Sequence, residues 1–275
     1  MTGWDVIWWN IMVVISGVNL LLAVFMFARS LKMKKVEPDN SRYFLILRLM
    51  GILFVSVAMY RSVFVTSYPD RLVWFDSLFN SPFIVRCLAL FAELAFIGMI
   101  AAVLLKFCKD SGLNNNGSKY ATLLTKTPYI AIGSIALAQP LAFFGLTTQY
   151  VILFAIEEAL WALAFMSITP LVLYALKQKE HIAGYKLFLT VMAVWCVGYL
   201  SFQCFFALPF MYFAELAQDI GRVVPPDSLR VAIYEYTVTR DFDTWGGIGF
   251  IIWHSGYFSL CSWMSLLYMS APRKR

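Results

Sequence analysis

Residues 82–106 read PFIVRCLALFAELAFIGMIAAVLLK, and this stretch decides the class of fold. A helix of about 20 apolar residues crosses a hydrocarbon core about 30 Å thick, and the stretch is longer than that. Strands of a membrane barrel would be short and would alternate between apolar and polar residues. Because lipid offers the backbone no hydrogen-bond partners, a helix is the conformation that satisfies every amide within the segment. The stretch is therefore predicted to be a transmembrane helix.

The rest of the chain has the composition of an integral membrane protein. Of its 275 residues, 61% are apolar and 14% are charged, whereas about 25% are charged in soluble domains. These proportions exclude a disordered chain and an ordinary soluble enzyme. We predict an all-α fold, a single domain over residues 1–275 that forms a polytopic transmembrane bundle of seven helices, with residues 213–245 as an extracytoplasmic segment. The predicted spans are 8–29, 43–66, 82–106, 128–147, 149–176, 186–212 and 246–270.

The basic residues predict the orientation of the bundle. Fifteen of the 22 fall on one side of the predicted membrane, namely Arg29, Lys32, Lys34, Lys35, Arg42, Lys106, Lys109, Lys119, Lys126, Lys177, Lys179, Lys186, Arg273, Lys274 and Arg275. Basic loops stay in the cytoplasm, so we expect the N-terminus outside, the C-terminus inside and a location in the cell membrane. The opposite side carries four arginines and nine acids, which we expect to form a solvated rim that includes Arg71.

The net charge and the sequence motifs also limit the kinds of binding partner that we expect. The formal net charge of +6 follows from the basic cytoplasmic side, where anionic membrane lipid is the natural contact. No basic stripe alternates with aromatic residues on a soluble face, so nucleic-acid binding is not expected. With two histidines and neither a CxxC nor an HExxH motif, we expect no metal and assign no cofactor.

Charged side chains inside the predicted spans mark a candidate site, because such residues usually pair or line a wet cavity. Arg48 lies near the cytoplasmic end of its span, and we expect it to be structural. The others fall in the outer halves of five spans, together with one amide and one imidazole. If these faces converge, they form a polar pocket open to the outside. The candidate ligand-binding residues are Arg61, Arg86, Glu93, Glu157, Gln203, His254 and Tyr257, and the candidate acid–base residues are Glu93, Glu157, Glu158 and His254.

Each of these residues also has a structural interpretation. Arg86 and Glu93 are two turns apart on one helix face, where they could form an ion pair that joins helices. Adjacent residues of a helix point about 100° apart, so we expect one of Glu157 and Glu158 to face the bundle and the other a neighbouring helix or headgroup. A lone histidine such as His254 is more often a hydrogen-bonded packing residue than a catalyst.

Several motifs resemble known membrane proteins. Seven helices with an external N-terminus resemble the rhodopsin topology, but the last span has no lysine for a retinal Schiff base. The run 156–161 is similar to the paired-glutamate motif of membrane-embedded lycopene cyclases, in one copy and without its proline, so no activity is carried across. A broader set of motifs comprises Trp74-Phe-Asp76, Arg86 with Ala89, Ala92 and Glu93, Glu157-Glu158 with Trp161, Val238-Thr-Arg-Asp241 with Trp245, and Trp253-His-Ser-Gly-Tyr-Phe258. These motifs resemble those of a family of bacterial seven-helix proteins without an assigned activity, and the resemblance implies the fold and the same candidate positions.

Three functional hypotheses remain open. The first is a protein that binds a lipid-like or other small ligand, or that serves as a sensor or subunit among other membrane proteins. The second is an acid–base enzyme that acts on a lipid or isoprenoid, with Glu93 and Glu157 or Glu158 as acid and base. The third is a proton or ion pathway, which ranks last because the inner halves of the spans offer only scattered polar groups.

Overall fold

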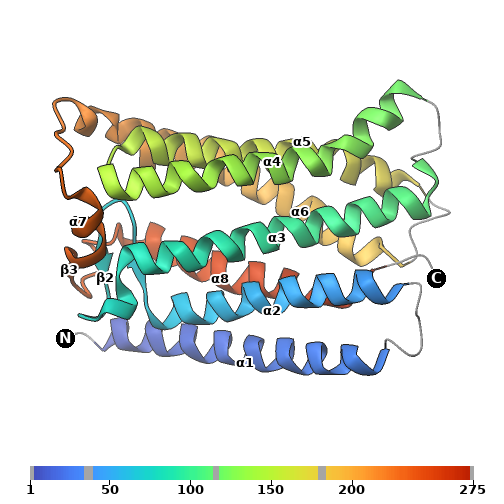
Figure 1. Cartoon of the computed structure of the whole chain (residues 1–275), viewed down its shortest axis with the longest axis horizontal. Coiled ribbons are helices and arrows are strands. Elements are labelled where there is room, and N and C mark those ends of the chain that lie inside the picture. Colours follow the sequence, from blue (N-terminus) through green and yellow to red (C-terminus); the bar gives the residue numbers. More distant parts are fainter. Residues whose placement is uncertain (1–2, 34–39, 114–117, 179–183, 273–275) are drawn as a thin grey trace.

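The computed structural model describes residues 3–33, 40–113, 118–178 and 184–272. It is an all-α bundle with its long helices side by side (Figure 1). The α-helices are α1 (Trp4–Met33), α2 (Ser41–Val63), α3 (Pro82–Asp110), α4 (Lys119–Thr148), α5 (Val151–Lys177), α6 (Lys186–Phe202), α7 (Ser228–Tyr234) and α8 (Gly247–Met269). Of the predicted cytoplasmic cations, Lys34, Lys35, Lys179, Arg273, Lys274 and Arg275 lie outside the described residues.

Within the described residues, six helical segments are long and apolar enough to cross a membrane. They are α1 to α5 and the continuous stretch Lys186–Asp219 that begins with α6. Helix α8 is as long as α2 but falls short in hydropathy, because His254, four serines and three glycines interrupt its apolar residues. The chain is therefore a helical protein of the multi-pass membrane type, with α8 packed against α1, α2 and α3.

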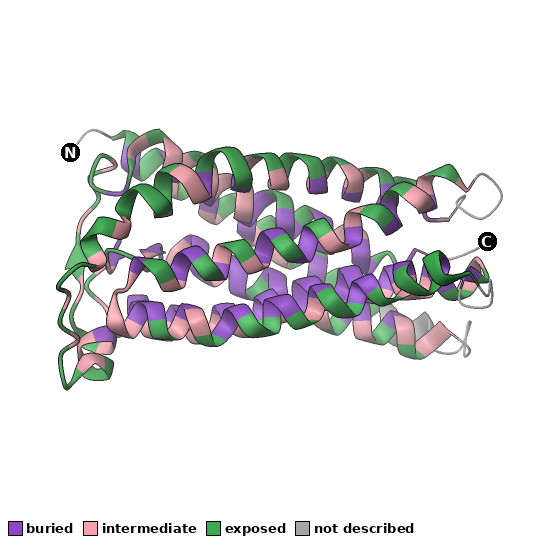
Figure 2. Cartoon of the chain, turned by 90° about the horizontal axis from the view of Figure 1, so that it is seen from above, coloured by how far each residue is buried: buried purple, intermediate pink, exposed green. Residues whose placement is uncertain are grey.

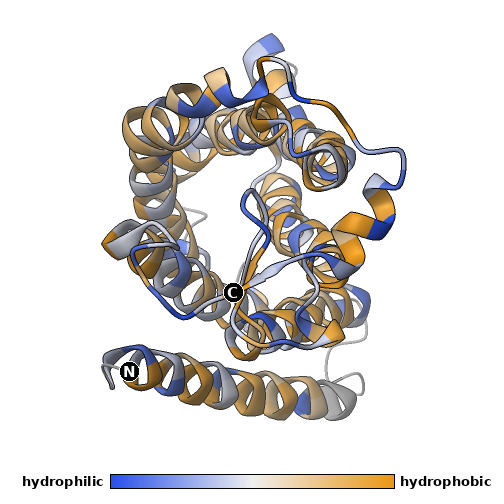
Figure 3. Cartoon of the chain, turned by 90° about the vertical axis from the view of Figure 1, so that its left-hand side faces the viewer, coloured by the Kyte–Doolittle hydropathy of each residue, from blue (hydrophilic) through white to orange (hydrophobic). Residues whose placement is uncertain are grey.

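Whether a residue is buried depends on which side of its helix it occupies. Buried residues face the interior of the bundle and exposed ones face outward (Figure 2). Large apolar side chains are exposed on the outer surface, among them Leu21, Phe25 and Val194. Seen from the end where α1 begins, the helices are mainly hydrophobic, and hydrophilic residues gather in the connections (Figure 3). This surface suits contact with lipid tails rather than with water.

Two helix boundaries differ from the predicted ones. Helix α4 begins at Lys119 rather than near residue 128, so Pro128 lies inside it, because polar residues of the first two turns conceal this part of the helix from a hydropathy pattern. The sixth span is α-helical only to Phe202. It continues as a π-helix, η4 (Gln203–Tyr212), and then as a 3₁₀ helix, η5 (Phe213–Asp219). Pro209 lies in η4 and lacks an amide proton, so a regular α-helical ladder cannot pass through it.

A small sheet closes the end of the bundle where α1 begins. Strand β1 (Thr66–Ser67) pairs antiparallel with β2 (Leu72–Val73), and β3 (Thr237–Val238) pairs parallel with β2. A short 3₁₀ helix, η2 (Leu78–Asn80), follows the hairpin. The sheet joins the connection between α2 and α3 to the segment that precedes α8, so both are held over the same end of the bundle (Figure 1).

Arg71 fixes the hairpin to helix α4. The prediction of a solvated rim is wrong for this residue, since its Nη2 donates to the carbonyls of Leu146 (2.9 Å) and Thr147 (3.2 Å). The last carbonyls of a helix lack partners within the helix and carry the negative end of its dipole. A guanidinium there satisfies both, so Arg71 caps α4 from another part of the chain.

We expect Arg71→Met to lower the free energy of unfolding by about 1–3 kcal/mol, because it removes charged hydrogen bonds but keeps an apolar stem. Arg230→Met is the matched control. Its side chain is 60% exposed and bridges Asp227 and Glu235, so its loss should destabilise the protein much less than the loss of Arg71. Unfolding by sodium dodecyl sulfate in mixed micelles measures both. Equal losses for the two variants would contradict the capping role of Arg71.

Candidate functional site

An ion pair within helix α3 forms the base of the candidate site. Arg86 and Glu93 are seven residues apart, so both lie on one face of the helix. The guanidinium of Arg86 runs along the helix and donates two parallel hydrogen bonds to the Glu93 carboxylate, Nη1 to Oε1 at 3.0 Å and Nη2 to Oε2 at 3.1 Å. The residues are 2% and 5% exposed. A paired, bidentate arrangement is the geometry that lets two charges remain buried in an apolar bundle.

Three other helices contribute to this network. Gln139 of α4 accepts a hydrogen bond from Arg86 at 2.7 Å and donates one to Glu93 at 3.0 Å. Glu157 of α5 lies 3.4 Å from Nη2 of Arg86, and Arg61 of α2 lies 4.0 Å from Glu93. Sequence analysis did not select Gln139. The available signal was a lone amide in the middle of an apolar span, directly before Pro140.

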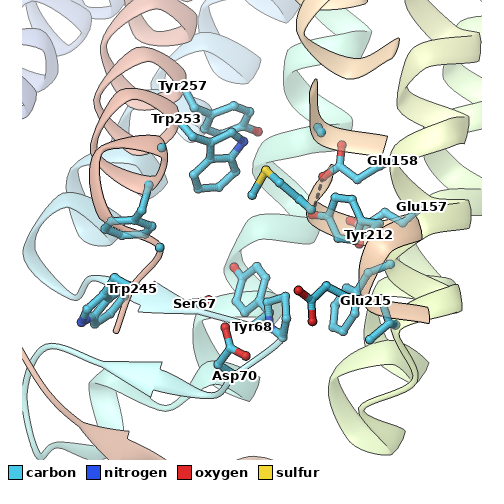
Figure 4. Close-up of a pocket in the computed structure, with 18 of the residues that line it drawn as sticks. Ser67, Tyr68, Asp70, Glu157, Glu158, Tyr212, Glu215, Trp245, Trp253 and Tyr257 are labelled. Carbon is cyan, nitrogen blue, oxygen red and sulfur yellow. Dashed lines mark hydrogen bonds between the residues drawn. The ribbon is translucent and has the colours of Figure 1, made fainter. Parts of the chain in front are cut away.

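A cavity of about 450 Å³ adjoins this network. It lies between α8 on one side and α5 with η4 on the other, and the β1–β2 hairpin reaches into it (Figure 4). Trp253 and Tyr257 stack on each other with ring centroids 5.5 Å apart, opposite Glu157 and Glu158. The predicted site residues that line the cavity are Arg61, Arg86, Glu93, Glu157, Glu158, Gln203 and Tyr257.

Both glutamates of the doublet face this cavity. Whereas Glu157 contacts Arg86, Glu158 accepts a hydrogen bond from Nε2 of Gln203 and a longer one, at 3.5 Å, from the hydroxyl of Tyr212. Gln203 and Tyr212 are the first and last residues of the π-helix η4. The wider turn of a π-helix often occurs at functional sites, and here it brings both side chains to the carboxylate.

Tyr68 enters the cavity from the hairpin and was missed by sequence analysis. The guanidinium carbons of Arg61 and Arg86 lie 5.1 and 5.7 Å from the centre of its ring. Its hydroxyl is buried and has no hydrogen-bond partner among the described residues. Burial raises the pKa of the Tyr68 phenol, and the two arginines lower it by a smaller amount. Tyr68 therefore keeps its proton at neutral pH and offers a hydroxyl to whatever occupies the cavity.

The mouth of the cavity is acidic. Asp70, Glu215 and Asp243 line the cavity from the connections between the spans, and Arg222 is among the lining residues of the same connections. Burial raises the pKa of the Asp70 carboxyl, and the neighbouring Glu215 raises it further. Carboxylates held close together in this way attract cations from solution.

His254 does not line the cavity, although sequence analysis included it in the site. It is 1% exposed and packs against Trp8, Phe250 and Phe258, with ring centroids 5.4, 5.2 and 4.5 Å away. Trp253 and Tyr257, four residues apart, turn one face of α8 toward the cavity, and His254 follows Trp253 by about 100°. Its imidazole therefore lies against Trp8 of α1 instead.

Comparisons with other proteins do not assign this site. No protein-family model, curated protein or solved structure matches the chain. Within the part of the chain that the structure describes, no group of three or more His, Cys, Asp or Glu side chains is arranged to hold a metal ion. The geometry of the cavity is thus the evidence on its function.

We expect Arg86→Met to lower the free energy of unfolding by about 3–5 kcal/mol, because it removes the bidentate partner of the buried Glu93 carboxylate and leaves it only the more distant Arg61, 4.0 Å away. Adding Glu93→Leu to this variant should recover part of the loss, since it removes the uncompensated charge. A double-mutant cycle measured by unfolding in mixed micelles gives the coupling energy. Additive losses for the two substitutions would show that the pair is not coupled.

Proposed function

We propose that this chain is a seven-span protein of the cell membrane, with its N-terminus outside and its C-terminus in the cytoplasm. Helix α8 is the seventh span in this proposal. In support, α1 begins and α8 ends at opposite ends of the bundle, which requires an odd number of crossings (Figure 1). The lysines in the last turns of α3 and the first turn of α4 lie at the opposite end of the bundle from the acidic residues around the cavity, which agrees with the positive-inside rule.

In this orientation the cavity faces outward and binds a small amphipathic or lipid-like ligand. The observation that carries the proposal is the cavity itself, whose volume of about 450 Å³ is within the range of small-molecule sites. Its wall combines aromatic rings with a few charged groups that converge from several helices, which is the usual composition of a ligand site. A ligand site of this kind fits a sensor or a subunit of a membrane complex. The resemblance to bacterial seven-helix proteins is compatible with both roles.

An acid–base enzyme acting on a lipid or isoprenoid is the second candidate. One observation favours it: Glu157 and Glu158 share the cavity but have different partners, a guanidinium for one and an amide with a phenol for the other. When two carboxyls have different environments, one can act as the general acid and the other as the general base. Glu93 is less suited to proton transfer, since Arg86 and Gln139 already engage both of its oxygens.

Cysteine accessibility tests whether the cavity is open to the outside. Ala207 lines the cavity and Ala164 lies in the packed core, and both are buried, so Ala207→Cys and Ala164→Cys form a matched pair. We expect membrane-impermeant methanethiosulfonates, one cationic and one anionic, to modify position 207 in intact cells and to leave position 164 unmodified. Mass spectrometry of the peptides measures the modification at each position.

Val223→Cys is the positive control for that experiment, because Val223 is 85% exposed in the segment before α7. Modification at position 223 without modification at position 207 by either reagent would overturn the outward-facing cavity. Absence of modification at both positions would overturn the proposed orientation.

A further inference from the structure

We propose that the cavity selects an organic cation, namely a substituted ammonium that carries an apolar group and at least one N–H. This inference rests on the proposed function and names the chemical class of the ligand. Four observations support it. The wall of the cavity has an excess of acidic groups, and the carboxylate of Glu158 has no cationic partner among the described residues. Aromatic rings lie opposite Glu158, and the buried Oε1 of Gln203 has no hydrogen-bond donor among the described residues.

The wall of the cavity has an excess of acidic groups. Six carboxyl side chains and three arginines line it, so its formal charge is −3 when all are ionised. All three arginines already lie beside acids, since Arg61 is 4.0 Å from Glu93, Arg86 pairs with Glu93 and Glu157, and Arg222 is 3.8 Å from Asp219. A low-dielectric cleft lined by one sign of charge concentrates ligands of the opposite sign.

Glu158 is the acid that remains for a ligand at the deep end of the cavity. It forms no ion pair among the described residues, and its two hydrogen bonds come from the neutral side chains of Gln203 and Tyr212. Glu157, beside it, shares Arg86 with Glu93. A cation placed next to Glu158 would supply the missing counter-charge, whereas an anion there would face repulsion.

Aromatic rings surround the position that such a cation would take. The stacked pair of Trp253 and Tyr257 lies across the cavity from Glu158, Tyr212 stands beside Glu158, and Tyr68 enters from the hairpin (Figure 4). Organic ammonium groups bind to the faces of tryptophan and tyrosine rings, and the attraction grows when the pair is withdrawn from water. A hydrated metal ion would gain little from these rings, because it requires several oxygen ligands at close range.

Gln203 indicates that the ligand carries an N–H group. A carboxylate only accepts hydrogen bonds, so the contact with Glu158 fixes the Nε2 of Gln203 toward that residue. The Oε1 of Gln203 is then buried and has no donor among the described residues, although the residue is 2% exposed and lines the cavity. An acceptor left in this state costs free energy that an ammonium N–H of the ligand would recover.

Competition for the thiol introduced at position 207 tests this inference on the purified full-length Ala207→Cys protein. The thiol reacts with the neutral reagent iodoacetamide, and two probes compete with it: N,N-dimethylbenzylamine, which is protonated at pH 7, and N,N-dimethylbenzamide, which has nearly the same shape and no charge. We expect the ammonium to give half-maximal protection at a concentration about tenfold lower than the amide does. Phenylacetate, an anion of similar size, should not protect.

Substitutions then identify the groups responsible. Glu158→Gln should abolish most of the tenfold preference, and Trp253→Leu should weaken protection by the ammonium more than protection by the amide. Glu235→Gln is the matched control, since Glu235 is an exposed acid outside the cavity and should leave the preference unchanged. Because these ratios compare two probes on one variant, they do not depend on its stability.

The outcomes separate this inference from the proposed function. Equal protection by ammonium and amide, or a preference that survives Glu158→Gln, would overturn the organic cation and leave an outward-facing ligand cavity intact. If iodoacetamide modifies the thiol of the Val223→Cys protein but never the introduced thiol of the Ala207→Cys protein, the cavity is closed to small molecules and both proposals fail.

Discussion

The cost of burying charge in an apolar bundle governs the arrangement of this protein. A guanidinium and a carboxylate removed from water each lose several kcal/mol of solvation, which only close pairing can offset. Arg86 and Glu93 meet that requirement with two parallel hydrogen bonds, and Gln139 satisfies both partners from another helix. The network can form only when α2, α3, α4 and α5 are in register, so it specifies how these helices rotate against one another.

The same network determines which groups remain for a ligand. Arg86 is occupied by Glu93 and Glu157, so the acid next in sequence, Glu158, faces the cavity with neutral donors alone. The π-helix η4 supplies these donors, and the sheet with Arg71 keeps the hairpin and its tyrosine over the opening. The packed ion pair and the open cavity are thus two consequences of one set of buried charges.

Sequence reasoning predicted the helical fold because hydropathy over 20 residues is a strong signal, and it selected, by their depth in the spans, the charged residues of α2, α3 and α5 that line the cavity. It failed where the answer depends on how a side chain is rotated about the axis of its helix. A shift of one residue turns a side chain by about 100°, which is why His254 faces aromatic residues while Trp253 lines the cavity. Tyr68 and the pairing of β2 with β3 depend on contacts between distant segments, and the π-helix depends on the surroundings of Pro209. None of these has a local pattern.

The most direct test of the buried network and its cavity is a cryo-electron microscopy map of the full-length protein in lipid nanodiscs. We expect the Arg86 guanidinium to contact the Glu93 carboxylate at the base of an open cavity, with Glu157 and Glu158 both on its wall. A map in which the two glutamates turn to the acyl chains, and in which aromatic side chains fill the space between α5 and α8, would contradict this arrangement.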